Sequence, residues 1–374
     1  MLRALATRSD LSYVYFADPG AASLTWAELP FCREIVGVPK PASYGIAQLL
    51  QGIAGRWPLP VLNYRSEQMA GAVRRMTEGT LYDLVHLDSI HMTRYAQGLS
   101  APVIYNWHNI ESEAMRRYGA VVKSTARRWY AGVTAAKWEQ LETELLQTAF
   151  GHVVCSERER EHLRQIDERA RIAVVPNGVD TQYFAGAGDG KAGRDLVFVG
   201  SMDYPPNAEA AALFTGRIWP HVRKRFPEAR LLIVGANPGP SVRALAEAPG
   251  VQVTGTVPDT RPYYREALAA IVPLRSGGGT RLKILEAMAA GVPVISTPLG
   301  AEGLDVTPGK DILIAGPDDA EQWVDHLVRL AEPPGSMRQA LTAAALDLAR
   351  SRYDWGGLGQ NLWTTYQEWL RGKT

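Results

Sequence analysis

The chain has 374 residues, of which 46% are hydrophobic and 21% are charged, and its formal net charge is +1. That length is enough for two domains of ordinary size, and the near-neutral charge excludes a general attraction to nucleic acid. Two cysteines, Cys32 and Cys155, are too few for a disulfide framework and fit a reducing compartment. No apolar run reaches membrane-spanning length, so we expect a cytoplasmic protein.

The first half of the chain alternates strand-like and helix-like segments. The opening residues, MLRALATRSD, are typical of the end of a helix rather than its beginning. This alternation predicts a parallel sheet covered on both faces, whose ligands bind beyond the carboxyl ends of the strands. We expect strands at 11–17, 33–38, 60–63, 82–88, 103–107, 151–156 and 172–176, with helices at 43–55 and 67–76.

Polar residues follow two of these predicted strands. His86 and Asp88 share a strand face and His91 follows, which raises the alternative of a metal site. The spacing is not diagnostic and no thiolate or further carboxylate joins them, so we expect no metal there. His108 follows the strand VIYNW directly, where the motif HNIE is either a helix cap or part of a functional site.

A basic and aromatic segment spans residues 115–138. It contains six basic residues and no acidic one, with tyrosine and tryptophan side chains interleaved: Arg116, Arg117, Tyr118, Lys123, Arg127, Arg128, Trp129, Tyr130, Lys137 and Trp138. One interpretation is a solvated helical face. The other is docking on anionic lipid headgroups, which basic and aromatic helices favour.

A glycine-rich stretch near 186–194 predicts the join between two domains. We place an N-terminal domain at 1–187 and a C-terminal domain at 188–354, with the last helix, 355–374, returning to the first domain. The second half again alternates, with strands expected at 196–200, 230–234, 251–254, 270–274 and 294–296, and helices at 208–225, 241–248, 261–267, 281–290, 319–332, 337–350 and 355–370.

The most informative stretch runs from Ala270 to Gly303. A short apolar strand is followed by a glycine-rich turn, Ser276–Thr280, then a helix and a second strand. The free N–H groups of the first helical turn and the helix dipole favour an anion at this position. Arg281 and Lys283 add positive charge there, which predicts a phosphate site; the alternative is a tight turn with two solvated basic residues. Glu286 lies further along the helix, where it could accept hydrogen bonds from sugar hydroxyls.

The run from Pro273 to Gly291 resembles the donor-binding signature of the retaining glycosyltransferases of family four, also called glycosyl transferases group one. Glu286, in the phrase EAMAAG, matches the second of two glutamates in that signature, but Gly278 stands at the position of the first. The resemblance implies the α/β glycosyltransferase-B fold: two doubly wound, Rossmann-like domains facing each other across a cleft. It also implies that an N-terminal strand and a glycine loop usual in the family do not precede Leu11.

The resemblance further implies a set of site residues. Arg281 and Lys283 would hold the donor diphosphate, because Ser201-Met202 replaces the basic residues that relatives carry after the glycine at Gly200. His108 would lie beside the transferred sugar. The remaining donor-binding positions would be Gly200, Ser201, Gly277, Gly278, Gly279, Thr280, Leu282 and Glu286. No metal or other cofactor is expected for this chemistry.

The implied activity is transfer of a sugar, with retention, from a nucleotide-diphosphate sugar to an acceptor hydroxyl. The acceptor would be a sugar or a lipid-linked molecule in cell-surface polysaccharide or glycolipid synthesis, and the protein could bind the inner face of the membrane. Because Gly278 replaces a glutamate, two alternatives stay open: a nucleotide-sugar-binding subunit without turnover, or a nucleotide-sugar epimerase or hydrolase on the same fold. A dehydrogenase is disfavoured because neither GSMDYPP nor GANPGP makes the dinucleotide fingerprint.

Overall fold

The computed structural model describes residues 1–17, 29–41, 45–122, 124–188, 193–277, 281–332 and 337–372. These residues form two compact units. Unit 1 contains Met1–Pro176 and Gly359–Thr374, and unit 2 contains Asn177–Leu358. The domain boundary predicted at 187/188 therefore lies inside unit 2, because the segment after Pro176 packs with the second unit.

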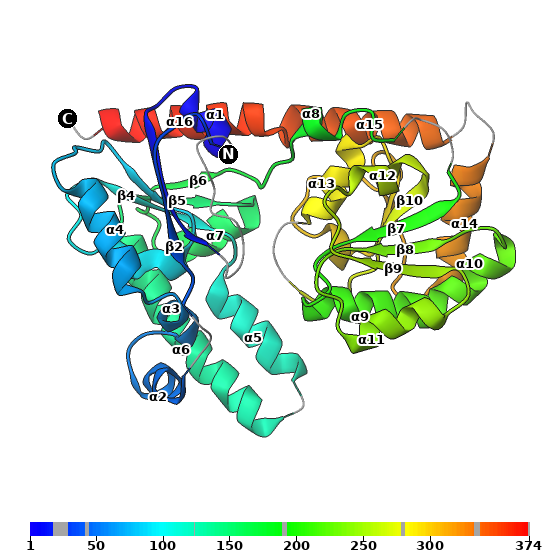
Figure 1. The fold of residues 1–374 in the computed structure, drawn as a ribbon, viewed down its shortest axis with the longest axis horizontal. Helices are drawn as coiled ribbons and strands as arrows, with labels where there is room; N and C mark the ends of the chain where they lie inside the picture. Colours follow the sequence, from blue (N-terminus) through cyan, green and yellow to red (C-terminus); the bar gives the residue numbers. More distant parts are fainter. Residues whose placement is uncertain are drawn as a thin grey trace. The chain divides into compact units, whose positions relative to one another are not determined.

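Unit 1 contains two parallel sheets with helices packed around them (Figure 1). β1 pairs with β2, and the other sheet has the order β3-β4-β5-β6. The elements are α1 Leu2–Ala6, β1 Leu11–Ala17, β2 Cys32–Pro39, α2 Ile46–Ala54, α3 Leu59–Asn63, α4 Glu67–Thr77, β3 Val85–Leu87, η1 Ile90–Ala96, β4 Val103–Trp107, α5 Glu111–Val121, α6 Thr125–Thr148, β5 Gly151–Val154, α7 Glu157–Ile166, β6 Ile172–Val174 and most of α16, Trp355–Arg371.

Unit 2 contains one sheet of six parallel strands. Its elements are α8 Thr181–Phe184, β7 Asp195–Val199, α9 Pro205–Leu213, η2 Phe214–Ile218, α10 Trp219–Arg225, β8 Leu231–Val234, α11 Pro240–Arg243, η3 Ala244–Glu247, β9 Val251–Gly255, α12 Arg261–Arg265, β10 Ala267–Val272, α13 Leu282–Ala289, β11 Val294–Ser296, η4 Leu299–Ala301, β12 Leu313–Ile314, α14 Ala320–Ala331 and α15 Met337–Arg352.

The strand order in unit 2 sets the place where a ligand can bind. The order is β12-β11-β10-β7-β8-β9, so the chain builds outward from β7 to β9 and then crosses back to place β10 on the other side of β7. This is the arrangement of the doubly wound nucleotide-binding sheet. In sheets of this order, ligands bind at the carboxyl ends of the two strands between which the order reverses, here β7 and β10.

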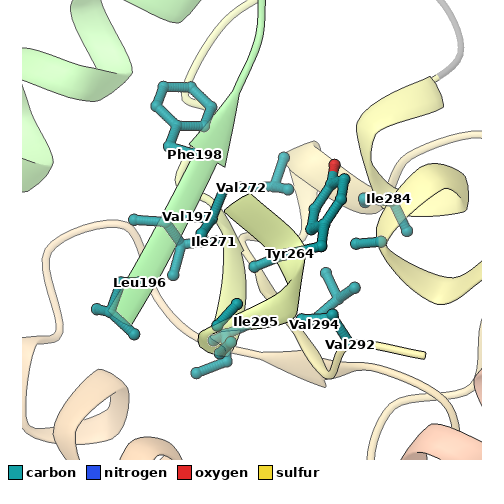
Figure 2. Packing of buried hydrophobic residues seen from close by; sticks show 14 of the residues in the cluster. Leu196, Val197, Phe198, Tyr264, Ile271, Val272, Ile284, Val292, Val294 and Ile295 are labelled. Atoms are coloured by element: carbon teal, nitrogen blue, oxygen red, sulfur yellow. The ribbon is translucent and has the colours of Figure 1, made fainter. Parts of the chain in front are cut away.

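The core of unit 2 explains why these segments form central strands. Every residue of β10 is buried, and so are the residues of β8 and β11, as expected for strands covered on both faces. Figure 2 shows β7 contributing Leu196, Val197 and Phe198 to this core, with the ring of Tyr264 near Val294. Because β7 and β10 are parallel neighbours, the residues that follow them, Gly200 and Pro273, leave the sheet at the same edge.

The predicted strand at 60–63 is wrong, because Leu59–Asn63 forms the short helix α3. A short apolar run does not distinguish a strand from one buried helical turn. Here Pro60 lies in the first turn of the helix, where proline is well tolerated, and Leu59, Val61 and Leu62 are buried. The strand β12 was not predicted, since two residues carry too little periodicity to be recognised.

Candidate functional site

The loop after β7 and the loop after β10 meet at the carboxyl ends of these two strands in unit 2. A Cβ atom added at Gly200 would lie 2.7 Å from Nδ2 of Asn207 and 3.1 Å from Nζ of Lys283. A Cβ atom added at Gly277 would lie 2.9 Å from the hydroxyl of Tyr204, and Gly277 has a φ of +100°, which side-chain-bearing residues rarely adopt. Both glycines are therefore required by the close approach of the two loops.

Lys283 is the central cation of this site. Its Nζ donates a hydrogen bond to Oδ1 of Asn207 at 2.6 Å and lies 5.0 Å from the centroid of the Phe198 ring. Burial, together with the positive charge of Arg281, lowers the pKa of Lys283 to about 8, while Glu286 opposes the shift. An ammonium group held in this way gains from a nearby anion, because an anion would favour its charged form.

Asn207 connects the two loops and was not predicted as a site residue. Besides accepting from Lys283, its Nδ2 donates to the backbone oxygen of Ser201 at 2.8 Å, and the residue is 5% exposed. Ser201, a predicted site residue, donates from Oγ to Oδ1 of Asp203 at 2.5 Å. An asparagine after two prolines is typical of a helix start. Its position at the beginning of α9 was therefore the one sequence signal for Asn207, and it did not indicate a binding role.

Arg281 lies directly before α13 and is 4% exposed. Its guanidinium donates to the backbone oxygen of Gly277 at 2.9 Å and to that of Leu299 at 3.5 Å. The side chain therefore fixes the start of the glycine turn as well as placing positive charge beside Lys283. The predicted residues Gly278, Gly279 and Thr280 lie outside the described residues.

Glu286 and Leu282 complete the predicted residues of α13. Burial raises the pKa of the Glu286 carboxyl, although the charge of Lys283 opposes this shift. Leu282 is 43% exposed, so the helix begins with an apolar side chain at the surface. The site thus gathers two cations, one carboxyl group and two glycines at the end of a parallel sheet, which is an arrangement that can bind a phosphate group next to a hydroxyl-rich group.

A second polar cluster lies in unit 1 at the carboxyl ends of β3 and β4. His108 Nε2 donates to the backbone oxygen of Asp88 at 2.8 Å and lies 3.5 Å from Oδ1 of the Asp88 carboxylate. Asn106 donates to the same carboxylate at 2.7 Å, and His86 Nε2 lies 3.7 Å from it. On the other side of His86, Nδ1 forms a hydrogen bond with the hydroxyl of Tyr366 from α16.

The charges in this cluster are strongly coupled. The hydrogen bond to Asp88 raises the pKa of His108 to about 10, and the Cys155 thiol contributes to the same shift. Desolvation would raise the pKa of Asp88, but hydrogen bonds from His108, His86 and Asn106 outweigh it and hold the pKa well below its usual range. At neutral pH His108 is therefore a protonated imidazole held by a carboxylate.

Two further carboxyl groups, Glu111 and Glu142, interact with each other, and Glu111 also interacts with His108. Glu111 opens α5, and burial together with the nearby Glu142 raises its pKa to about 7. Glu142 is fully buried and accepts from the backbone N–H of Ser112 at 3.1 Å. The sequence predicted Glu111 only as part of a helix cap. The structure shows in addition that Glu111 interacts with His108.

The alternative of a metal site at His86, Asp88 and His91 finds no support. His91 turns away from Asp88: its Nδ1 lies 2.8 Å from Ser89 Oγ, and its ring packs edge-on against Trp138 at 4.9 Å. Burial, together with the charge of His108, lowers the pKa of His91 to about 4. Within the part of the chain that the structure describes, no three His, Cys, Asp or Glu side chains are placed to hold a metal ion.

Comparisons with known proteins match both halves of the chain to glycosyltransferase families. Residues 31–183 match the family described as Glycosyltransferase Family 4, and residues 193–333 match Glycosyl transferases group 1. Among curated relatives, a phosphatidyl-myo-inositol mannosyltransferase of Mycobacterium tuberculosis (strain CDC 1551 / Oshkosh) is 30% identical over 205 residues, covering 52% of this chain and 53% of the relative. A D-inositol 3-phosphate glycosyltransferase of Actinosynnema mirum is 29% identical over 225 residues, covering 53% and 52%.

Solved structures show the same fold. Sucrose-phosphate synthase from Thermosynechococcus elongatus aligns with a TM-score of 0.70 at 17% identity, over 96% of this chain and 89% of that one. Anabaena HepE, solved in complex with UDP and glucose, aligns with a TM-score of 0.63 at 14% identity, over 94% and 91%. The chain spans about half the length of the curated relatives it matches.

The fold is the glycosyltransferase-B fold, with two Rossmann-like units. The chain belongs to glycosyltransferase family 4, of the glycosyl transferases group 1. The resemblance and the fold class inferred from the sequence are thereby confirmed. None of the helices in the described ranges is both long enough and apolar enough to cross a membrane.

Proposed function

We propose that this protein transfers a sugar from a nucleotide-diphosphate sugar to an acceptor hydroxyl, with retention of configuration at the anomeric carbon. The observation that carries the proposal is the meeting of Gly200, Asn207 and Lys283 at the carboxyl ends of β7 and β10. Open α/β sheets bind nucleotides at this position, and the glycine lets the side chains of Asn207 and Lys283 come close to the backbone of the loop after β7.

The donor diphosphate binds between Lys283, Arg281 and the backbone of the glycine turn. Negative charge develops on the leaving diphosphate as the bond to the anomeric carbon breaks, and cations already in position stabilise that charge. Lys283 is the cation beside the backbone of Gly200, while Arg281 donates a hydrogen bond to Gly277 and adds its positive charge to the site. Glu286 accepts hydrogen bonds from ribose hydroxyls. We propose that these groups suffice without a metal ion.

His108 of unit 1 is proposed to contact the transferred sugar. The imidazole already forms hydrogen bonds with Asp88 and the Cys155 thiol, so it would act on the sugar through its positive charge, which the Asp88 carboxylate maintains at neutral pH. His108 would thus help to bind the donor and to stabilise negative charge on it. The acceptor oxygen replaces the diphosphate oxygen at the anomeric carbon, and the acceptor proton leaves with the released diphosphate.

The curated relatives support the class of acceptor. One is described as a mannosyltransferase acting on phosphatidyl-myo-inositol and another as a glycosyltransferase of D-inositol 3-phosphate. We propose a sugar or lipid-linked acceptor, a role in cell-surface polysaccharide or glycolipid synthesis, and a location at the cytoplasmic face of the membrane.

A second candidate function is donor binding without turnover. It is favoured by Gly278, which stands where similar enzymes carry the first of two glutamates. Such a protein would bind the nucleotide sugar and support an active partner. An epimerase or hydrolase on the same fold would instead convert the donor without any acceptor.

The test is a product assay on the full chain with a panel of nucleotide sugars. Each donor is incubated with and without simple glycoside and lipid-linked acceptors, and products are identified by mass spectrometry, with NMR of the new glycosidic bond. Acceptor-dependent product with the donor's anomeric configuration supports the proposal, also in the presence of a chelator. Donor binding without product supports the binding subunit, and donor conversion without acceptor supports the epimerase or hydrolase.

A further inference from the structure

The helices α5 and α6 form an antiparallel hairpin that extends away from the β3–β6 sheet (Figure 1). α5 begins at Glu111, soon after the strand end that carries His108, and the end of α5 and the start of α6 lie at the far end of the hairpin. Near this end, the described residues 116–118 and 127–129 are exposed to solvent. We call the residues Arg116–Tyr118 and Arg127–Trp129 the hairpin tip.

The hairpin tip combines exposed aromatic and basic side chains. Trp129 is 57% exposed and Tyr118 is 41% exposed, which is unusual for large apolar groups. Arg127 and Arg128 are exposed as well, and neither has an acidic partner among the described residues. Arg116 pairs with Glu139 and Arg117 with Glu113, so the excess charge of the tip comes chiefly from the other two arginines.

The rest of the basic segment is used inside the fold. Lys137 donates to the backbone oxygens of Gly52, Ile53 and Gly55 at 2.6–2.7 Å, which satisfies the end of α2. Trp138 is fully buried. Among the described residues of 115–138, the exposed basic and aromatic side chains are those of the hairpin tip.

The chemistry of the tip fits the surface of a lipid bilayer with anionic headgroups. Tryptophan and tyrosine rings settle at the boundary between headgroups and acyl chains, where one edge is apolar and the other is wet. Guanidinium groups match phosphate oxygens geometrically, and each basic residue near an anionic surface strengthens binding. The sequence from Ala114 through Trp138 contains no aspartate or glutamate, so nothing within this segment repels anionic lipid.

We propose that the hairpin tip docks on an anionic bilayer surface, with Trp129 and Tyr118 entering the headgroup layer and Arg127 and Arg128 binding lipid phosphates. This surface does not depend on the donor site, although docking would serve the proposed function by bringing a lipid-linked acceptor to the strand end that starts α5. The near-neutral charge of the whole chain disfavours nucleic acid as the partner. The exposed rings of Trp129 and Tyr118 disfavour a purely acidic protein surface.

The test is sedimentation of the full chain with phosphatidylcholine vesicles that contain or lack phosphatidylglycerol. We expect binding only to the anionic vesicles, and a partition coefficient lowered about tenfold or more by the double change Arg127→Ala/Arg128→Ala. The matched control is Lys224→Ala/Arg225→Ala, which removes an adjacent exposed basic pair at the end of α10 in unit 2. This control should bind like the wild type.

A second readout locates the aromatic contact. Brominated lipid should quench part of the tryptophan fluorescence of the wild type, and Trp129→Phe should remove that part while circular dichroism stays unchanged. Three results would overturn the proposal: no binding to anionic vesicles, equal binding by the Arg127/Arg128 variant, or equal loss in the α10 control. Vesicle binding is measured without a sugar donor. Its outcome is therefore independent of whether the sugar-transfer proposal is correct.

Discussion

Lys283 of α13 and Asn207 of α9 are joined by a hydrogen bond of 2.6 Å between Nζ and Oδ1. The two helices follow β10 and β7, the adjacent central strands between which the direction of the sheet order reverses. Asn207 also binds the backbone oxygen of Ser201, so a single amide group fixes the lysine relative to the loop after β7. This contact holds the cation of the proposed donor site beside the backbone of Gly200.

Asn207→Ala should weaken binding of the nucleoside diphosphate. The change removes the acceptor that positions Nζ of Lys283 and the donor that holds Ser201, each worth about 1 kcal/mol. We expect the dissociation constant to rise about tenfold, measured by isothermal titration calorimetry. Lys224→Ala, an exposed change on α10, serves as the control. An unchanged dissociation constant in Asn207→Ala would show that Lys283 needs no such support.

Gly200→Ala should displace Asn207 or Lys283 and so abolish diphosphate binding, without unfolding the unit. The new methyl group would lie 2.7 Å from Nδ2 of Asn207 and 3.1 Å from Nζ of Lys283, so at least one of these side chains must move. We expect loss of diphosphate binding with a decrease of about 1–3 kcal/mol in the free energy of unfolding. Gly216→Ala is the matched control, because a Cβ atom there meets nothing within 4 Å. Equal affinities in both variants would contradict the assignment.

Binding of the diphosphate should depend on pH through Lys283. Its pKa is lowered to about 8 by burial and by the Arg281 charge, so the free protein carries a charged lysine below that pH and a neutral one above it. Affinity should therefore fall as the pH rises above about 8, and binding there should take up a proton. In Lys283→Arg the guanidinium stays charged and the fall should disappear. A wild-type affinity that stays flat across this range would refute the idea.

Asp88→Asn should change the titration of His108. The carboxylate raises the pKa of His108 to about 10, so the native pairing stabilises the fold fully below the unfolded value of 6.5, and this contribution is lost as the pH rises through about 10. With asparagine, the pKa of His108 should drop toward its ordinary value. NMR titration of labelled histidine measures both proteins, with His108→Asn used to assign the signal. A wild-type His108 that already titrates near 6.5 would be incompatible with the pairing.

Sequence reasoning predicted the glycine turn, Arg281, Lys283 and Glu286 as one site because all of them follow one strand within a βαβ unit. Gly200 was predicted through the family resemblance, and the structure places it beside Lys283. Asn207 was missed, since its role depends on contacts with a loop far away in the sequence. The Asp88–His108 pair likewise depends on β3 and β4 being neighbours, which local periodicity does not reveal.

The secondary-structure prediction was wrong where segments were short. The run Leu59–Asn63 has the composition of a strand, but it packs as one turn of helix with proline in its first turn. Long segments were predicted well: α15, for example, was expected at 337–350 and spans Met337–Arg352. Hydrophobic periodicity needs several turns to separate a helix from a strand, whereas tertiary packing decides the structure of a five-residue run.

The most direct test of the donor site is calorimetric titration of UDP, GDP and ADP into the wild type, Lys283→Ala and Lys224→Ala. The account predicts that one nucleoside diphosphate binds the wild type and the Lys224 variant equally well. Its affinity for Lys283→Ala should fall at least about tenfold, because a charge-assisted hydrogen bond to phosphate is lost. Equal binding by all three proteins, or no binding of any nucleoside diphosphate to a folded wild type, would contradict a donor site at the carboxyl ends of β7 and β10.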